Sequence, residues 1–223
     1  MIELIMPLYK RVYRLPEIID DLNNQTEKDF RLNVWSNTGL RELNMNKAQF
    51  EYQVALSSVN IGSSARFKML SKTEGNPIIF FDDDEKLDKD FISYHLSEYE
   101  KWGDDCILGW YSKLLDKDTY RDDLAIFLPY GTEVDFIGTG GMVIGRKAYE
   151  MIPELSNLPK EFMMAEDIYL SAKARRAGFK LVSIEKKCEI IDDVFNSNRK
   201  FFFEKQKAFE RLRKEGWKLL SEI

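Results

Sequence analysis

Short apolar runs alternate with segments of helical periodicity through the first hundred residues of this chain. Between the first two runs, apolar side chains from Leu15 to Leu22 recur at i, i+3, i+4 and i+7, the spacing of one helix face. This alternation is typical of βαβ units, so the sequence predicts an α/β fold with a central, mainly parallel sheet flanked by helices. The runs predicted to form its strands are residues 2–7, 30–35, 52–57 and 77–81.

The second half of the chain repeats this pattern less regularly. Its clearest helix signal is residues 166–177, which Gly178 closes at the C-terminal cap. Earlier in the chain, Ser63 or Ser64 is predicted to cap the helix that carries Arg66. The further elements we expect are strands at residues 106–111, 134–137, 141–144 and 180–184 and a short helix at residues 147–151.

Length and composition favour one compact domain. The chain has 223 residues, of which 44% are hydrophobic and 32% are charged, so it can bury a substantial core. No repeat, low-complexity tract or linker interrupts it. We therefore expect a single domain covering residues 1–223.

Bulk features also argue against several classes of protein. No apolar run approaches the roughly 18 residues of a membrane span, and the first residues lack the basic lead of a signal peptide. Cys106 and Cys188 are the only cysteines and fit no zinc or disulfide spacing, which favours a cytoplasmic protein. The net charge of −5 argues against a nucleic-acid partner.

The most informative motif is a run of four acids, from Asp82 to Glu85, that directly follows residues 77–81. Because those residues are apolar on both alternating faces, they predict a central strand covered by helices on both sides. Ligands of open α/β sheets bind outside the carboxyl ends of the strands, where these acids would lie. Carboxylate oxygens suit Mg²⁺ or Mn²⁺, and such an ion bridging to phosphate oxygens would offset the repulsion among the acids. The alternative is a solvated acidic turn, which does not require a buried strand before it.

Four motifs, taken in order, resemble glycosyltransferase family 2, whose members have the Rossmann-like GT-A fold. They are the turn from Ile5 to Arg11, the loop Asn60-Ile61-Gly62 with Ala65-Arg66, the acids after Phe81, and Ala165-Glu166-Asp167. The resemblance covers about residues 1–185. It implies a nucleotide-binding half at residues 1–100, an acceptor-binding half at 101–195 and a C-terminal helix at 196–223.

In that family the turn after the first strand and the end of the second strand surround the nucleotide base. The resemblance therefore assigns Pro7, Tyr9 and Arg11 to the base pocket, together with Ser36 and Asn37. Tyr9 offers a flat face for a pyrimidine, and Asn37 has both a donor and an acceptor for its edge. The family usually has Asp where Ser36 and Asn37 stand, and uracil is the expected base. The alternative for Tyr9 is a half-buried core aromatic.

The same resemblance places Asn60 and Arg66 beside the nucleotide, where Arg66 can close over a carboxylate or phosphate. In the family's Asp-x-Asp motif the first acid contacts the ribose and the second binds the metal. These roles fall to Asp82 and Asp84, with Asp82 also counted among the metal ligands and Asp83 among the nucleotide-sugar contacts. Arg66 can at the same time be a structural partner of these acids.

Glu166 and Asp167 match the acidic pair that the family places under the acceptor, where one carboxylate is the catalytic base. A helix N-terminus stabilises a carboxylate as an anion and keeps it ready to accept a proton. We assign the base to Asp167, with Glu166 beside it in the catalytic site. Ordinary acids at a helix N-terminus are the alternative. The glycine-rich residues 135–141 resemble the family's acceptor- and sugar-facing loop, the alternative being a strand connection.

Many GT-A enzymes supply a further metal ligand, often His, from their C-terminal part. The single histidine here, His95, falls in a predicted helix, where we expect it on the surface. Asp193, in the pair that follows residues 187–191, has the more suitable place. The resemblance thus implies Mn²⁺ or Mg²⁺ held by Asp84, Asp82 and Asp193.

The C-terminal residues 200–220 mix aromatic and basic side chains. Such a segment can lie on a membrane surface as a peripheral contact, or meet an acceptor or a second copy in a homo-oligomer. The alternative is a helix that docks Phe202, Phe209 and Leu212 on the core and leaves its lysines in water. The second arrangement is favoured.

Together the motifs imply a metal-dependent, inverting glycosyltransferase that moves a hexose from a UDP-sugar to a hydroxyl of a glycan, glycoprotein or lipid-linked acceptor. The Gln-x-x-Arg-Trp motif of processive synthases is absent, which favours the addition of single sugars. A sugar nucleotidyltransferase is one alternative, but residues 8–11 lack the glycines that its phosphate loop needs. A non-catalytic nucleotide- or carbohydrate-binding module is the other, and intact Asp84 and Asp167 count against it.

Overall fold

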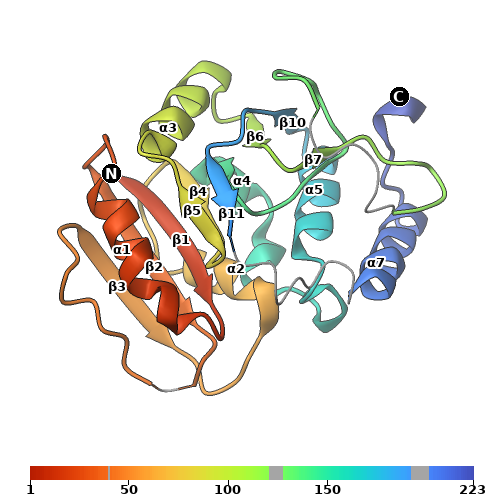
Figure 1. Cartoon of the computed structure of the whole chain (residues 1–223). Coiled ribbons are helices and arrows are strands. Elements are labelled where there is room, and N and C mark those ends of the chain that lie inside the picture. The colour runs from red at the N-terminus through yellow and green to blue at the C-terminus, as the bar shows by residue number, and fades with distance from the viewer. Residues whose placement is uncertain (40, 121–127, 192–200) are drawn as a thin grey trace.

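The structure is a computed structural model that describes residues 1–39, 41–120, 128–191 and 201–223. It consists of a twisted central sheet with helices on both faces, and the C-terminal helix lies at one end of the molecule (Figure 1). The α/β class expected from the alternating pattern is confirmed.

The central sheet has the strand order β10-β6-β9-β4-β1-β2-β3. Its neighbouring strands are parallel except where β9 pairs with β4 and β6, to both of which it is antiparallel. The sheet is therefore mainly parallel, as predicted. Its strands are β1 (Ile2–Leu8), β2 (Phe30–Ser36), β3 (Glu51–Leu56), β4 (Ile78–Phe80), β6 (Cys106–Gly109), β9 (Met142–Ile144) and β10 (Lys180–Ser183).

Two small antiparallel sheets lie beside the central one. The first joins β5 (Glu85–Leu87) to β11 (Cys188–Ile190), and the second joins β7 (Ser112–Lys113) to β8 (Phe136–Ile137). The first of these sheets begins within the acidic run, because Glu85, the last acid of the run, is the first residue of β5. It fixes the end of that run against a segment about a hundred residues further along the chain.

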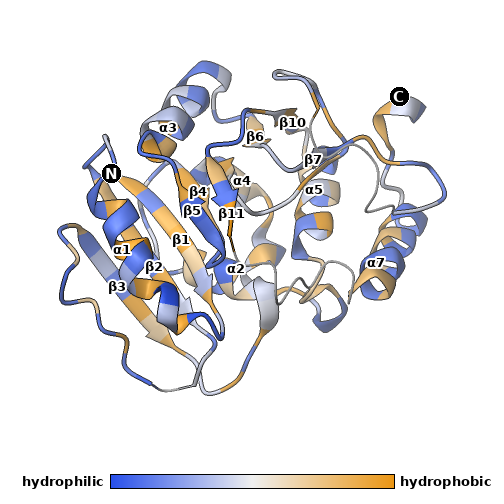
Figure 2. Cartoon of the chain, in the orientation of Figure 1, coloured by the Kyte–Doolittle hydropathy of each residue, from blue (hydrophilic) through white to orange (hydrophobic). Residues whose placement is uncertain are grey.

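The helices cover both faces of the sheet (Figure 1). The α-helices are α1 (Leu15–Asn23), α2 (Ala65–Leu70), α3 (Phe91–Trp102), α4 (Arg146–Met151), α5 (Glu166–Arg176) and α7 (Phe202–Lys214). Short 3-10 helices occur at Val12–Arg14, Gly62–Ser64, Pro153–Asn157, Lys160–Phe162 and Leu220–Glu222. Hydrophobic and hydrophilic residues alternate along α1 and α7 (Figure 2), and the hydrophobic residues Leu15, Ile18, Ile19 and Leu22 of α1 and Phe209 and Leu212 of α7 are buried.

The core has two layers because successive side chains of a strand point to opposite faces of the sheet. Along β4, Phe80 packs in the layer that contains α2 and α5, whereas Ile79 packs in the layer that contains α1 and α3. Phe80 meets Phe67 of α2 edge to face, with ring centroids 5.7 Å apart. On the other side, Phe81 meets Phe91 of α3 at 6.3 Å. The prediction that residues 77–81 are covered on both faces is confirmed.

The remaining sequence predictions agree with the structure at most positions. The predicted strands and helices are present with ends that differ by one or two residues, except residues 134–137 and the C-terminal helix, which was predicted at 196–223 and is α7 at Phe202–Lys214. At residues 134–137 only Phe136–Ile137 is a strand, and it pairs with β7 outside the central sheet. Gly178 has a φ of 90° directly after α5, which confirms its place at the C-terminal cap.

Two local predictions are wrong. Neither serine caps α2, because the Ser64 hydroxyl donates to the Ile61 carbonyl at 2.6 Å and the Ser63 hydroxyl bonds to Glu166. His95 lies in α3 as predicted but is fully buried, with Nε2 3.2 Å from the carbonyl of Gly141. Burial lowers the pKa of His95 to about 4. It is a core residue that contacts the glycine-rich segment.

The C-terminal helix α7 docks on the core. Phe209 and Leu212 are buried against the layer that contains α5, and Phe202 is half-buried beside it. The docking favoured from the sequence is therefore confirmed, but the expectation that the helix leaves its lysines in water is wrong for Lys205, which is buried. In the described parts of the chain, no helix is long and apolar enough to cross a membrane.

Candidate active site

A cleft of about 590 Å³ opens at the carboxyl ends of β1, β2 and β4. Strand register brings these ends together, because Leu8 is aligned with Ser36 and Ile5 with Phe80. Because β9 is antiparallel, the segment before it reaches the same edge. The predicted site residues that line the cleft are Pro7, Tyr9, Arg11, Asn37, Asn60, Arg66, Asp82, Asp83, Asp84, Glu166 and Asp167.

Asp83 fastens the acidic run to the turn after β1. Its Oδ2 accepts from the backbone N–H of Tyr9 at 2.8 Å, and its Oδ1 accepts from Nη1 of Arg11 at 2.9 Å. Arg14 reinforces this contact by donating to the Asp83 carbonyl at 2.6 Å. Burial raises the pKa of Asp83 to about 6 in spite of these donors. Asp83 and Arg11, both expected to contact the nucleotide, are thus engaged in shaping the cleft wall.

Asp82 and Asp84 point more openly into the cleft than Asp83. The side chains of Asp82 and Asp84 are 34% and 25% exposed, compared with 8% for Asp83. Each has one buried arginine partner: Arg66 Nη2 lies 2.8 Å from Asp82, and Arg11 Nη2 lies 3.2 Å from Asp84. Burial and the charge of Asp82 raise the pKa of Asp84 to about 7. Full ionisation of the cluster is therefore unfavourable without a further cation.

Glu85, the last acid of the run, lies at the base of the cleft and is almost fully buried. Its Oε2 accepts from the backbone N–H of Asp82 at 2.9 Å, so it holds the acidic turn closed. Burial and the nearby Asp82 raise its pKa to about 8. The sequence showed this acid as part of the motif, but its positioning role depends on a backbone contact that no residue pattern reveals.

The end of β2 contributes differently from the prediction. Ser36 is completely buried, and its hydroxyl lies 2.7 Å from that of Thr38, so it does not line the cleft. Asn37 does line it, but its amide is engaged with the neighbouring loop. Its Nδ2 donates to the Gly62 carbonyl at 3.0 Å, and its Oδ1 accepts from the N–H of Ile61 at 3.2 Å. Asn37 therefore holds the loop that precedes Arg66.

Arg66 links the acidic run to the N-terminus of α5. Besides Asp82, it contacts Glu166, with Nε 3.4 Å from Oε1. Its Nη1 is buried and has no hydrogen-bond partner among the described residues. A buried donor without a partner is costly in a folded protein and common where a ligand binds. Arg66 thus has a free hydrogen-bond donor for an anionic ligand.

The carboxylate of Glu166 contacts three side chains. Oε1 contacts Arg66 and lies 3.4 Å from the hydroxyl of Thr139, and Oε2 accepts from the Ser63 hydroxyl. Burial and the charge of Asp167 raise the pKa of Glu166 to about 7. The partners Ser63 and Thr139 were not anticipated, because they lie 103 and 27 residues away from Glu166 in the sequence.

Asp167 occupies the second position of α5 and faces the cleft. Its Oδ1 accepts from the N–H of Ile168 at 2.9 Å, and its Oδ2 lies 3.5 Å from Nζ of Lys205. Lys205 comes from α7 and also lines the cleft. The sequence shows Lys205 only as one lysine of a basic helix, so its contact with Asp167 could not be predicted.

The glycine-rich residues 135–141 divide between two roles. Gly138 and Gly140 line the cleft, as expected for a ligand-facing loop. A Cβ at Gly140 would lie 2.6 Å from Glu85 Oε1 and 3.4 Å from Asp82 Oδ2, so the absence of a side chain is required there. Asp135 instead accepts from the N–H of Leu220 at 2.6 Å and anchors the C-terminal segment. Only the second half of the segment belongs to the cleft.

The donor set suits a hard divalent cation. Asp82 and Asp84 line the cleft, and their arginine partners are shared with the further acids Asp83 and Glu166. No group of three or more His, Cys, Asp or Glu side chains among the described residues is arranged to hold a metal ion. Mg²⁺-like ions usually bind through one or two carboxylates together with substrate phosphates, which fits this arrangement. Asp193, the third ligand predicted from the sequence, lies outside the described residues.

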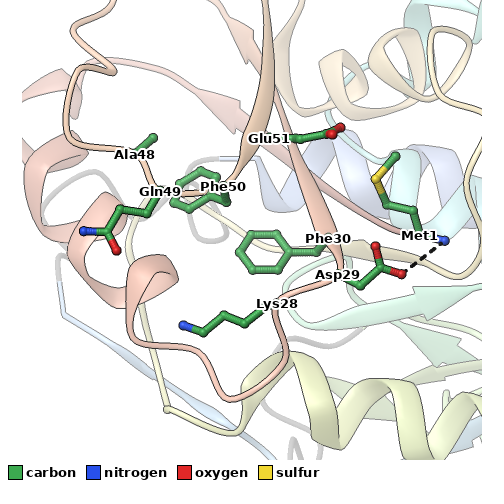
Figure 3. Close-up of a pocket in the computed structure, with 8 residues that line it drawn as sticks. All are labelled: Met1, Lys28, Asp29, Phe30, Ala48, Gln49, Phe50 and Glu51. Atoms are coloured by element: carbon green, nitrogen blue, oxygen red, sulfur yellow. Dashed lines mark ion pairs between the residues drawn. The ribbon is translucent and has the colours of Figure 1, made fainter.

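A second hollow, of about 420 Å³, lies at the opposite edge of the sheet (Figure 3). It is formed by the start of β1 and β2 and by the segment before β3. Phe30 and Phe50 form its floor, with ring centroids 5.3 Å apart. Its ion pair joins the N-terminal amine to the exposed side chain of Asp29. It contains no counterpart of the acidic run and is not a candidate site.

Comparison with known proteins decides the family of the chain. The model of the family described as glycosyl transferase family 2 matches residues 3–150, more than half of the chain. The chain belongs to glycosyl transferase family 2. The matched residues include the turn after β1 and Asp82 to Asp84, and they end before Glu166 and Asp167. The family implied by the sequence motifs is confirmed. No curated protein matches the chain in sequence.

Solved structures with the same fold include S. aureus TarS. A TarS fragment in complex with UDP-GlcNAc has a TM-score of 0.64 and 17% identity, with 86% of this chain and 58% of that chain covered. The complex with UDP has a TM-score of 0.61 and 16% identity, with 84% and 59% covered. A further TarS structure has a TM-score of 0.61 and 16% identity, with 91% and 38% covered. The family 2 chain thus spans between about a third and two thirds of the length of these proteins, and it shares their fold.

Proposed function

We propose that this family 2 glycosyltransferase transfers a hexose from a UDP-sugar to an acceptor hydroxyl, with inversion, in the cleft between the acidic run and α5. The observation that carries the proposal is the pairing in one cleft of an anion-binding corner and a carboxylate. The corner consists of Asp82, Asp84 and Arg66, and the carboxylate is that of Asp167. The two TarS complexes with UDP and UDP-GlcNAc support a uridine nucleotide as the donor.

Asp84 and Asp82 would hold Mn²⁺ or Mg²⁺ together with the diphosphate of the donor. When bound, such an ion neutralises the negative charge that develops on the departing diphosphate. Arg66 supports the same leaving group, because it lines the cleft and its buried Nη1 lacks a partner among the described residues. A hydrogen-bond donor that is already oriented in a partly buried site stabilises developing negative charge more effectively than water does. Tyr9, which is 41% exposed at the rim, offers its ring to the uracil.

Asp167 would accept the proton of the acceptor hydroxyl. As that proton moves to the carboxylate, the hydroxyl oxygen forms a bond to the anomeric carbon, and the bond from this carbon to the diphosphate breaks. Inversion follows from attack on the face opposite the leaving group. Asp167 suits the role better than Glu166, because three side chains, Arg66, Ser63 and Thr139, hold the carboxylate of Glu166 in place.

The acceptor is proposed to be a glycan, glycoprotein or lipid-linked hydroxyl compound. The cleft is also lined by Phe201, directly before α7, and by Ile190 of β11. These apolar side chains suit the ring face of a sugar or a hydrophobic portion of the acceptor.

A donor screen tests the proposal. UDP release would be measured from a panel of UDP- and GDP-sugars with and without Mn²⁺, for the wild type, Asp84→Asn and Asp167→Asn. We expect turnover of a UDP-hexose that requires the cation, no cation-dependent turnover by Asp84→Asn, and donor binding without turnover by Asp167→Asn. Near-wild-type turnover by Asp167→Asn would refute the base assignment. Equal turnover with and without cation would refute the metal requirement.

A further inference from the structure

Lys205 is a buried lysine at the wall of the proposed active-site cleft. It lies on the first turn of α7, is only 6% exposed, and lines the proposed active-site cleft. Lysine is almost never fully buried unless it is paired. Its Nζ lies 3.5 Å from Oδ2 of Asp167. A buried charge placed against the proposed base calls for a functional explanation as well as a structural one.

The position of Lys205 is fixed by the core. One turn further along α7, Phe209 is buried against Trp217, with ring centroids 5.7 Å apart. On the adjacent side of the helix, Gln206 Oε1 accepts from the backbone N–H of Tyr120 at 2.7 Å. The Tyr120 ring in turn lies 5.9 Å from Nζ of Lys205. Because α7 is held at several points, the ammonium group of Lys205 is fixed within the protein and does not have to move in from solvent.

The charges around Asp167 come from three helices. Lys205 faces it from α7, Glu166 lies beside it on α5, and Arg66 approaches from α2. Arg66 is already shared between Asp82 and Glu166, so Lys205 is the cation in direct contact with Asp167. An opposite charge at this distance favours the ionised form of a carboxylate, and a like charge opposes it. Lys205 thus holds one carboxylate oxygen of Asp167 from the side of α7.

We propose that Lys205 is a positioning residue for catalysis, which holds the carboxylate of Asp167 in the orientation that accepts the proton of the acceptor hydroxyl. The inference rests on the proposed function, because it assumes that Asp167 accepts the proton. It makes α7 part of the catalytic unit, although the helix contributes no residue to the anion-binding corner. If the ion pair only held α7 against α5, its removal would lower stability and leave the pH profile of kcat unchanged.

The test compares Lys205→Met, Lys205→Arg and Lys207→Met with the wild type. Lys207 is an exposed lysine on the same helix and serves as the matched control. For Lys205→Met we expect kcat to fall about 10- to 100-fold, the effect of losing one hydrogen bond to a charged group. The acid limb of its pH profile should move up by about one pH unit or more, as expected when an adjacent opposite charge is removed. Lys205→Arg should restore most of kcat, and Lys207→Met should match the wild type.

Affinity for UDP and thermal stability are measured on the same variants. Unchanged UDP affinity with a shifted profile supports the positioning role. A lower melting temperature with kcat and the pH profile within about twofold of the wild type would overturn it, because a fastening contact alone moves only stability. The titration of the Asp167 carboxylate, followed by carbon NMR in the wild type and Lys205→Met, gives a readout that needs no turnover. An unchanged midpoint would sink the inference about Lys205, whereas absence of turnover with every donor would sink the proposed function.

Discussion

Arg11 Nη2 lies 3.2 Å from Oδ2 of Asp84, so the acid proposed to hold the cation is already paired with a buried guanidinium. The same arginine reaches Asp83 at 2.9 Å. Its single positive charge is divided between two carboxylates, and neither is fully neutralised. A second cation could therefore neutralise the remaining negative charge of these carboxylates, which is the physical basis of the proposed metal requirement.

Replacing Arg11 should therefore increase the dependence of the fold on a divalent cation. We expect Arg11→Met to lower the free energy of unfolding by about 3 kcal/mol, because two buried carboxylates lose their partner. The increase in melting temperature on adding Mn²⁺ and UDP should be larger than in the wild type. Differential scanning fluorimetry with and without both ligands measures this. Arg14→Met is the matched control, because Arg14 donates to backbone carbonyls of the same run and not to its carboxylates. An equal ligand response in both variants would contradict the interpretation.

Stability of the cation-free protein should fall as the pH rises from about 4.5 to about 8. Burial, with nearby acids, raises the pKa of Asp84 to about 7, of Glu85 to about 8 and of Glu166 to about 7. Between the ordinary and the raised pKa values the folded state binds more protons than the unfolded state, so unfolding becomes easier as the pH rises. Urea midpoints at pH 5, 6, 7 and 8 measure this slope.

Two controls accompany the pH series. Glu85→Gln keeps an oxygen that can accept from the N–H of Asp82 but cannot ionise, so its slope should be smaller than that of the wild type. Saturating Mn²⁺ and UDP should also reduce the slope, because a bound cation favours the ionised acids. Stability that rises steadily over the same pH range would mean that the acids of the cleft do not dominate the pH response.

Gly140→Ala should impair the cleft without unfolding the protein. The new Cβ would lie 2.6 Å from Glu85 Oε1, so either the carboxylate or the glycine segment must shift. Because Glu85 holds the backbone of Asp82, we expect kcat/KM for the donor to fall about 10-fold or more while the fold persists. Steady-state UDP release, together with circular dichroism, measures the two effects. The double variant with Glu85→Asp, which shortens the obstructing side chain, should recover part of the loss; no recovery would refute the steric explanation.

Docking of α7 should depend on Phe209. It is buried in the core, so Phe209→Ala is expected to reduce the free energy of unfolding by about 3–5 kcal/mol. Phe203 on the same helix is 73% exposed, and Phe203→Ala should change stability by about 0.5 kcal/mol or less. Urea denaturation measures both. Similar losses of unfolding free energy in the two variants would show that the burial of a phenylalanine on α7 does not determine its contribution to stability.

Much of the site was predictable because its residues follow strand ends. Tyr9, Asn37 and Asp82 each come directly or almost directly after a predicted strand, and parallel strands bring their carboxyl ends to one edge. Glu166 and Asp167 were predictable as acids at the start of a helix. In each case a local pattern, read from neighbouring residues, was sufficient to place the residue at the cleft.

The partners of these residues were not predictable in the same way. Ser36 looked equivalent to Asn37 in the sequence, but it is buried against Thr38 and does not line the cleft. His95 was expected on the surface and lies instead in the core against Gly141. Which face of a helix is covered depends on the elements that pack against it, and here the covering segment is far away in the sequence.

The amino-acid order alone determined the α/β class, the position of most strands and helices, and the acidic run at the end of β4. These features depend on periodicity and on turn residues, which act between near neighbours in the chain. Only the tertiary structure decided that β9 is antiparallel, that Arg11 is shared between Asp83 and Asp84, and that Lys205 faces Asp167. Such contacts join residues 38 to 73 positions apart, and their geometry is set by how whole elements pack together.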